Sequence, residues 1–99
     1  MAQALSHFRV VEVGEAIASA HAAKLLADLG ADVVKVESPA GDPARRSGPF
    51  PGDRVDPEAS GLYLYLNCNK RGITLDLEAS KDRAVLAALL DRADLLIHS

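Results

Sequence analysis

Aromatic residues, cysteines and long apolar runs are all scarce in this chain of 99 residues. Aromatic side chains make up 4% and tryptophan is absent, so the core must come from Leu, Val, Ile and Ala. That composition favours helices packed on a parallel sheet over an all-β sandwich. No stretch approaches the roughly 18 uninterrupted apolar residues of a membrane span. The single cysteine, Cys68, excludes an internal disulfide and fits a reducing cytoplasm, where we expect the protein.

Positive charge is also in short supply, because the formal net charge is -3 at pH 7. An acidic chain is a poor match for nucleic acid or for an anionic membrane surface, and we expect neither as a partner. Apolar residues at 48% and charged residues at 25% are typical of a folded globular domain. The length leaves room for one domain, which we predict to span residues 1–99.

Short β-branched runs alternate with helical patterns, which predicts an α/β fold: a Rossmann-like parallel sheet with flanking helices. Periodicity alone does not decide whether residues 61–66 form a helix or a strand. Ser80 is the expected N-cap of the second helix. We expect strands over 8–13, 31–37, 73–77 and 93–98, and helices over about 16–29 and 80–91.

Each expected helix carries a stripe of apolar residues at helical spacing, which we expect to face the sheet. Gly30 follows the first helix, where a left-handed residue favours glycine. The stripes are Ala22, Leu25, Leu26 and Leu29 in the first helix and Val85, Leu86, Leu89 and Leu90 in the second.

The segment 38–60 is a long loop that holds all five prolines, several glycines and several arginines. Long loops inside compact domains are usually functional or disordered. This one follows the carboxyl end of the second strand, where open α/β sheets bind ligands. The last strand leaves apolar residues 95–97 with nothing after them in the chain to bury them. Either a partner covers this strand or the chain is a piece of a longer protein, and we expect the piece.

Two common kinds of site lack their residues. Gly14 and Glu37 stand at the spacing of a dinucleotide site, but residues 14–19 lack the second and third glycines of the GxGxxG motif. We therefore interpret Glu37 as a solvated acid and disfavour a nicotinamide or flavin site. The three histidines and Cys68 are scattered without ligand spacing, so we predict no metal.

Two pairs of basic residues stand out in this acidic chain. Arg45 and Arg46 lie in the long loop, Lys70 and Arg71 lie in a polar turn, and we expect both pairs near one edge of the sheet. Guanidinium and ammonium groups both bind phosphate. The residues alone leave two interpretations open, namely ligands of a small polyanion or ordinary solvated loop charges.

Four strings of residues together resemble one family. In this order and spacing they are similar to the amino-terminal portion of the family III CoA-transferases, the carnitine and bile-acid type called CaiB/BaiF. The resemblance covers essentially the whole chain. The strings are LLADLGADVVKVE over 25–37, GDPARR over 41–46, LNCNKRGITLDL over 66–77 and ADLLI over 93–97.

The resemblance implies the N-terminal part of an acyl-CoA:carboxylate CoA-transferase. In that family an aspartate carboxylate attacks a thioester, and an aspartyl anhydride and then an aspartyl-CoA thioester form. The catalytic Asp lies beyond the matched segment, so no catalytic residue is expected here and the 99-residue chain alone is predicted to be inactive. The implied substrates are an acyl-CoA and a carboxylic acid. The implied carrier is coenzyme A without a metal, and the implied assembly is an interlocked homodimer.

CoA contacts are implied by the resemblance in two places, the turn after the first strand and the segment after the Asn-Lys-Arg turn. Ser38 stands where the family often has a basic residue, and Arg45 or Arg46 is the expected substitute. The residues expected to bind CoA are Ile17, Ala18, Arg45, Arg46, Lys70, Arg71, Leu75, Asp76, Leu77 and Glu78.

Two alternatives stay open from the sequence. Some relatives in this family are acyl-CoA racemases, which abstract a proton beside the thioester. A noncatalytic module that binds CoA or a nucleotide is a different class of function. The acyl group and the acceptor acid are not specified by these residues.

Overall fold

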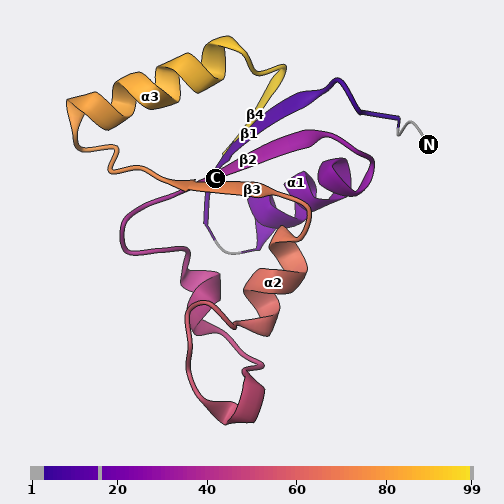
Figure 1. Cartoon of the computed structure of the whole chain (residues 1–99), viewed down its shortest axis with the longest axis vertical. Helices are drawn as coiled ribbons and strands as arrows, with labels where there is room; N and C mark the ends of the chain where they lie inside the picture. The colour runs from indigo at the N-terminus through magenta and orange to yellow at the C-terminus, as the bar shows by residue number, and fades with distance from the viewer. Residues whose placement is uncertain (1–3, 16, 99) are drawn as a thin grey trace.

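The computed structural model describes residues 4–15 and 17–98, which form one sheet with helices on both faces (Figure 1). Strands and helices alternate, which confirms the expected α/β fold. The elements are β1 (Arg9–Val13), α1 (Ala18–Asp28), β2 (Asp32–Glu37), η1 (Pro43–Arg46), η2 (Pro51–Asp53), α2 (Gly61–Asn67), β3 (Arg71–Thr74), α3 (Ser80–Asp91) and β4 (Leu95–His98).

The four strands pair in the order β3-β2-β1-β4, and every pairing is parallel. Helix α1 connects β1 to β2, and α3 connects β3 to β4 across the whole sheet. Because the strands are parallel, the carboxyl ends of β1, β2 and β3 meet at one edge. The expected Rossmann-like parallel sheet is confirmed, and the last strand lies at its outer edge beside β1.

Alternate side chains of the central strands point to opposite faces of the sheet. Helices α1 and α2 lie on one side of the sheet and α3 on the other (Figure 1). On the α1 face, Val10 and Val33 pack with Ala23 and Ala27. On the α3 face the buried core residues are Val11, Val36 and Leu75.

The predicted apolar stripe of α1 is correct at Leu26, which packs against the core, and wrong at the other three positions, which are exposed. Leu25 and Leu29 are about half exposed, and the buried apolar residues of the helix are Ala20, Ala23 and Ala27. Small side chains let the helix approach the valines of the sheet closely, which larger leucines would prevent. Periodicity identified the helix, but it did not identify the face that packs.

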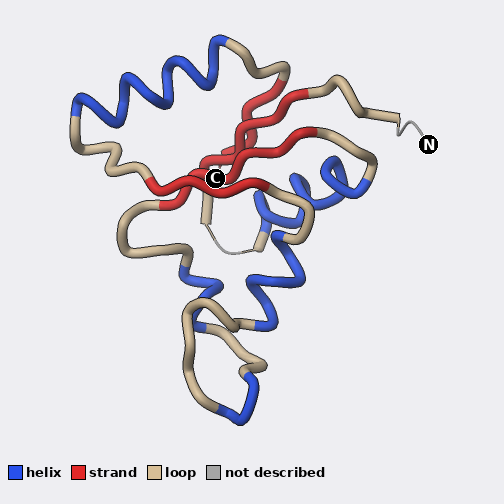
Figure 2. The backbone as a smooth tube through the Cα atoms, viewed as in Figure 1, coloured by secondary structure: helices blue, strands red, loops and turns tan. Residues whose placement is uncertain are grey.

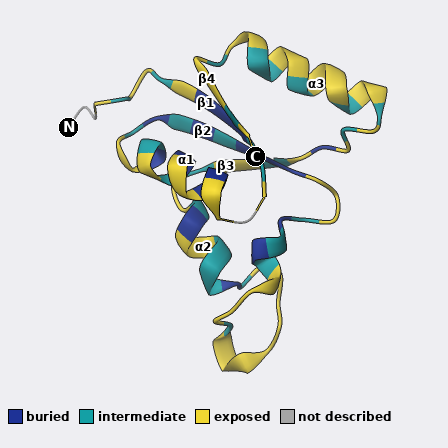
Figure 3. Ribbon diagram, turned by 180° about the vertical axis from the view of Figure 1, so that it is seen from behind, coloured by how far each residue is buried: buried dark blue, intermediate teal, exposed yellow. Residues whose placement is uncertain are grey.

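Helix α3 forms as predicted, but two details differ. The N-cap is Ala79 without a side-chain hydrogen bond, and Ser80 is the first helical residue. The helix has no buried residue, and Val85 is 43% exposed while the other three leucines of its stripe pack partly on the sheet (Figure 3). Helix α3 therefore packs on the sheet with one face, and its opposite face is exposed.

The strand predicted over 73–77 is displaced toward the amino terminus. Strand β3 spans Arg71–Thr74, and Leu75 follows it as a buried residue whose backbone N–H donates to Glu37 O (2.9 Å). The partner strand β2 ends at Glu37, so the residues after Leu75 have no strand to pair with. Residues 75–78 therefore continue beyond the carboxyl end of β3 as a loop instead of extending the sheet.

The long loop contains more structure than its composition predicts (Figure 2). Two short 3-10 helices, η1 and η2, occur within it, and Ser60 caps α2 by accepting a hydrogen bond from Tyr63 N (3.2 Å). The ambiguous run 61–66 is thus a helix. Gly30 adopts a φ of 99°, the left-handed conformation expected after α1.

Candidate functional site

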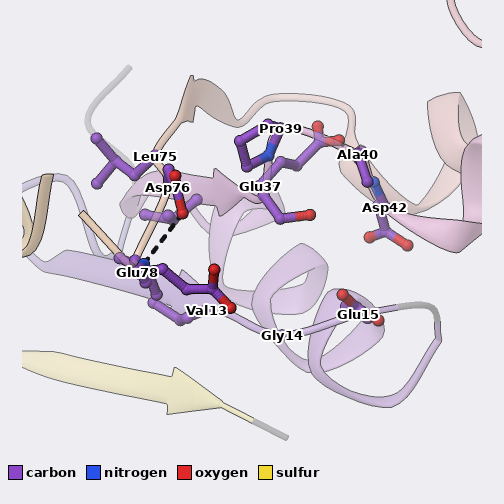
Figure 4. Close-up of a pocket in the computed structure, with 14 residues that line it drawn as sticks. Val13, Gly14, Glu15, Glu37, Pro39, Ala40, Asp42, Leu75, Asp76 and Glu78 are labelled. Atoms are coloured by element: carbon purple, nitrogen blue, oxygen red, sulfur yellow. Dashed lines mark hydrogen bonds between the residues drawn. The ribbon is translucent and has the colours of Figure 1, made fainter.

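A pocket of about 800 Å³ lies at the carboxyl ends of β1, β2 and β3 (Figure 4). Three stretches line it, residues 13–15 after β1, residues 36–42 at the end of β2 and beyond, and residues 75–78 after β3. Ligands of open α/β sheets bind outside the carboxyl ends of the strands. The volume also falls in the usual range of small-molecule sites. This pocket is therefore the candidate site.

The charged residues that line the pocket are all acidic, and within the described ranges no Lys or Arg lines it. Asp76 is positioned by its own loop, because its Oδ1 accepts from Glu78 N (3.0 Å) and its backbone N–H donates to Asp82 Oδ2 (2.8 Å). Carboxylates accept hydrogen bonds from hydroxyl and amino groups and repel phosphate. The acidic residues in the lining are Glu15, Glu37, Asp42, Asp76 and Glu78.

We call residues 38–42, which line the pocket after β2, the pocket wall. Glu37, the last residue of β2, lies directly before this wall. Arg45 binds both carboxylate oxygens, with Nε to Oε2 at 2.8 Å and a terminal nitrogen to Oε1 at 2.7 Å. The Tyr63 hydroxyl donates to Oε1 and Asp42 N donates to Oε2 (2.9 Å). Burial opposes the charged form, but these donors outweigh it and hold the pKa of Glu37 at about 2. The interpretation of Glu37 as a solvated acid is wrong.

The guanidinium of Arg45 makes several further contacts with the loop and with α2. It stacks on the Tyr63 ring at 3.8 Å from the centroid, and its remaining terminal nitrogen donates to Pro57 O (2.9 Å). Burial and then the hydrogen bond to Glu37 raise the pKa of the Tyr63 phenol. Arg45 therefore ties the distal part of the loop to the end of β2.

Beneath the pocket wall lies a buried network of two carboxylates and two ammonium groups. The Lys35 ammonium lies 3.0 Å from Glu12 Oε2 and 2.8 Å from Asp42 Oδ2, and the Lys70 ammonium lies 2.7 Å from Glu12 Oε1. The four side chains are at most 2% exposed. We call these residues, Glu12, Lys35, Asp42 and Lys70, the buried charge network.

Lys70 is enclosed in this network and does not face solvent. Besides Glu12, its ammonium donates to Ala20 O (3.0 Å) and Asn67 Oδ1 (2.7 Å), which uses all three of its protons. Burial lowers the pKa of Lys70, although the hydrogen bond to Glu12 acts in the opposite direction.

The two basic pairs do not lie at one edge of the sheet, contrary to the sequence-based expectation. Arg71 begins β3 and binds Asp32, the first residue of β2, in an exposed pair at the amino ends of the strands (2.7 Å). Arg45 and Arg46 follow the carboxyl end of β2. Arg46 is exposed, and its side chain makes no hydrogen bond or ion pair with any residue that the structure describes. The two pairs separate because Arg71 begins a strand, whereas Arg45 and Arg46 follow the end of one.

Four of the expected CoA contacts, residues 75–78, line the pocket together. Ile17 and Ala18 are exposed at the start of α1 and are not part of the lining. The basic residues expected to contact CoA do not line it either. Their assignment as CoA ligands stays a prediction.

Residues 13–15 and 39–42 were missed as parts of the site, as were Glu12 and Lys35 beneath it. A signal for the last two was present. Parallel strands are buried on both faces and read as apolar runs, so a charged residue inside each of two such runs indicates a buried ion pair.

No group of three or more His, Cys, Asp or Glu side chains in residues 4–15 and 17–98 is arranged to hold a metal ion. No helix among the same residues is long and apolar enough to cross a membrane.

The sequence was compared with the models of known protein families. Residues 5–99 match the family described as CoA-transferase family III. The chain belongs to this family. The resemblance of the four strings is thereby confirmed over nearly the whole sequence.

Curated relatives and solved structures agree with this family membership. Succinyl-CoA:(R)-benzylsuccinate CoA-transferase subunit BbsE of Thauera aromatica is 48% identical over 100% of this chain and 24% of its own length. Cinnamoyl-CoA:phenyllactate CoA-transferase of Clostridium sporogenes is 39% identical over 93% of this chain and 22% of its own length. A CaiB/BaiF family protein from Brucella suis superposes with a TM-score of 0.85 at 33% identity, over 97% of this chain and 25% of that one. The chain thus spans about a quarter of the length of these relatives.

Proposed function

We propose that this chain supplies the CoA-binding N-terminal part of an enzyme that moves CoA between an acyl-CoA and a free carboxylic acid. The observation that supports it most is the pocket at the carboxyl ends of three parallel strands in a chain of this family. CoA carries an adenosine moiety that such an edge accommodates well.

The acidic lining indicates how CoA would be oriented. Ribose hydroxyls and the adenine amino group donate hydrogen bonds, so they suit the carboxylates of Asp76 and Glu78. The phosphates would have to lie away from these groups, toward cations such as Arg46, which is exposed beyond the wall. Ile17 and Ala18, exposed at the start of α1, are proposed as further contacts.

The proposed chemistry needs an aspartate from outside this chain. Its carboxylate oxygen attacks the thioester carbonyl carbon, the carbon–sulfur bond breaks and the CoA thiolate leaves. That thiolate attacks the aspartyl carbonyl of the anhydride, which releases the first acid and leaves an aspartyl-CoA thioester. The acceptor carboxylate then attacks the aspartyl-CoA thioester, which releases the CoA thiolate and forms a second anhydride. The thiolate attacks the acceptor's carbonyl carbon in that anhydride, which gives the new acyl-CoA and frees the aspartate. The role of this chain is to hold the CoA while its thiolate is free.

The direct test is a transfer assay with the full-length protein. Succinyl-CoA is the donor, and the acceptors are the acids that appear in the names of similar enzymes: (R)-benzylsuccinate, mesaconate, phenyllactate and oxalate. We expect mass spectrometry to detect a new acyl-CoA with at least one acceptor, and none with the 99-residue chain alone.

A second arm separates the racemase alternative. The same protein is incubated with 2-methylacyl-CoA in deuterated water, where a racemase incorporates deuterium at the α carbon. Deuterium incorporation without transfer would contradict the transferase, and binding of CoA with neither reaction would indicate a noncatalytic module.

We also propose a homodimer in the cytoplasm, tested by sedimentation of the purified protein and by cell fractionation.

A further inference from the structure

The buried charge network joins four elements of the chain. Glu12 lies in β1, Lys35 lies in β2, Asp42 lies in the long loop and Lys70 precedes β3. Lys35 occupies the centre, because its ammonium contacts both carboxylates, at 3.0 Å and 2.8 Å. With two positive and two negative groups, the network has no net charge.

Such a network is a costly way to hold a sheet together. Removing charges from water is unfavourable, and well-packed apolar residues of similar volume often stabilise a core as well or better. The valines that surround Glu12 and Lys35 in their strands show that apolar residues fit these strands. The contacts made by Asp42 indicate what the network provides instead.

Asp42 holds the pocket wall in position through contacts of its backbone and side chain. Its backbone N–H donates to Glu37 Oε2 (2.9 Å), and its Oδ1 accepts from Ala44 N (2.9 Å) at the start of η1. Its Oδ2 is the atom that lies 2.8 Å from the Lys35 ammonium. Residues 36–42 form one side of the pocket, so the ion pair fixes the far end of that side to the sheet.

We propose that Lys35 is a positioning residue for the pocket, acting through Asp42 to hold residues 38–42 in the place where they form the wall. This inference rests on the proposed function, because the pocket is taken as the CoA site. Lys35 does not line the pocket itself. Its effect on CoA binding is therefore indirect, through the fraction of molecules in which the wall is in place.

Three variants of the full-length protein separate positioning from stability. Lys35→Met leaves the network with a charge of -1, Asp42→Asn leaves it with +1, and the double variant returns it to zero without the link between strand and loop. We expect the single variants to lower Tm by roughly 5 °C or more, because each leaves a buried charge uncompensated. The double variant should recover most of that loss.

CoA binding should not recover in the double variant. If the wall is in place in about a tenth of the molecules, the Kd for CoA by calorimetry rises about tenfold. Hydrogen exchange without ligand should show faster exchange at the backbone amides of Asp42, Ala44 and Ser47, which donate to Glu37, Asp42 and Ala44. The control is the double variant Lys24→Met with Asp28→Asn, which removes a Lys–Asp pair of α1 outside the pocket and should change neither readout.

The outcomes are distinguishable. Wild-type affinity for CoA in the double variant, or unchanged amide exchange in residues 42–47, would overturn the positioning role. Failure of the wild-type protein to bind CoA would overturn the proposed function, while the exchange measurement would still test whether Lys35 holds the wall.

Discussion

Ser60 is fully buried and serves two segments at once. Its hydroxyl accepts from Tyr63 N at the start of α2, and it shares its proton between Ala44 O (2.8 Å) and Ser47 O in the loop. A single side chain therefore caps a helix and closes the loop around η1. At the residue scale, the site depends on such buried polar contacts.

Replacement of Ser60 by Ala should lower the free energy of unfolding by about 1–3 kcal/mol, because the helix cap is lost and the carbonyl oxygens of Ala44 and Ser47 lose the hydroxyl that donates to them. Ser80→Ala is the matched control, since Ser80 is exposed and makes no cap hydrogen bond. It should change the free energy by less than about 0.5 kcal/mol. Chemical denaturation measures both, and equal effects of the two variants would contradict this account of Ser60.

Glu37 gives the protein an acid-sensitive contact. Its pKa is about 2 in the folded chain, against an ordinary value of 4.5, so it stabilises the fold above pH 4.5 and the stabilisation is lost as pH falls toward 2. The Glu37→Gln variant should be less stable than wild type at pH 7 and should lose less stability over that range. Tm measured from pH 7 to pH 2 tests this, and parallel curves for the two proteins would contradict it.

Sequence patterns identify such residues only in part. Lys70 and Arg45 look like phosphate ligands in sequence because both are basic residues in loops. In the structure they bind Glu12 and Glu37, carboxylates 58 and 8 residues away in the chain. Local sequence does not reveal which distant carboxylate a loop cation will meet. The segment 75–78 was found because the family resemblance, not periodicity, pointed to it.

Helix α2 packs closely against the loop that precedes it. A Cβ on Gly61 would lie 2.8 Å from Pro49 Cδ and Cγ and 2.9 Å from Pro49 O, closer than side-chain atoms normally approach. Gly61 N also donates to Pro49 O (2.7 Å). At the scale of elements, this contact fixes the start of α2 relative to the loop.

Gly61→Ala should destabilise the protein by about 1–3 kcal/mol, because Pro49 must move to make room for the methyl group. Gly72→Ala is the control, since a Cβ there meets nothing within 4 Å. It should be neutral within about 0.5 kcal/mol. Urea denaturation of both variants provides the comparison, and a neutral Gly61→Ala would show that the contact with Pro49 is not close in solution.

The elements were predicted better than their faces and ends. Periodicity located α1, α3 and all four strands, because alternation and helical spacing are local properties. It misplaced β3 by about two residues and chose the leucines of α1 over its alanines. Which face packs depends on how closely the sheet approaches the helix, and here Ala23 and Ala27 are the helical residues buried against Val10 and Val33.

For the molecule as a whole, the parallel sheet places three strand ends around one pocket, and family membership gives that pocket its proposed ligand. The place of the pocket follows from topology that the alternation of strands and helices already indicated, whereas the proposed ligand follows from the family. The wall supplied by residues 38–42 did not follow from it, because the course of a loop depends on tertiary ion pairs such as Lys35–Asp42.

The central claim is that CoA occupies this pocket, and a titration of the full-length protein with CoA tests it most directly. Ala40 is exposed and lines the pocket, so Ala40→Trp fills it without removing a buried group. Ala22 is exposed on α1 outside the pocket, so Ala22→Trp is the matched control. We expect Ala40→Trp to raise the Kd for CoA by about tenfold or more, which corresponds to roughly 1.4 kcal/mol, and Ala22→Trp to leave it unchanged. Wild-type affinity in the Ala40→Trp variant would contradict the account.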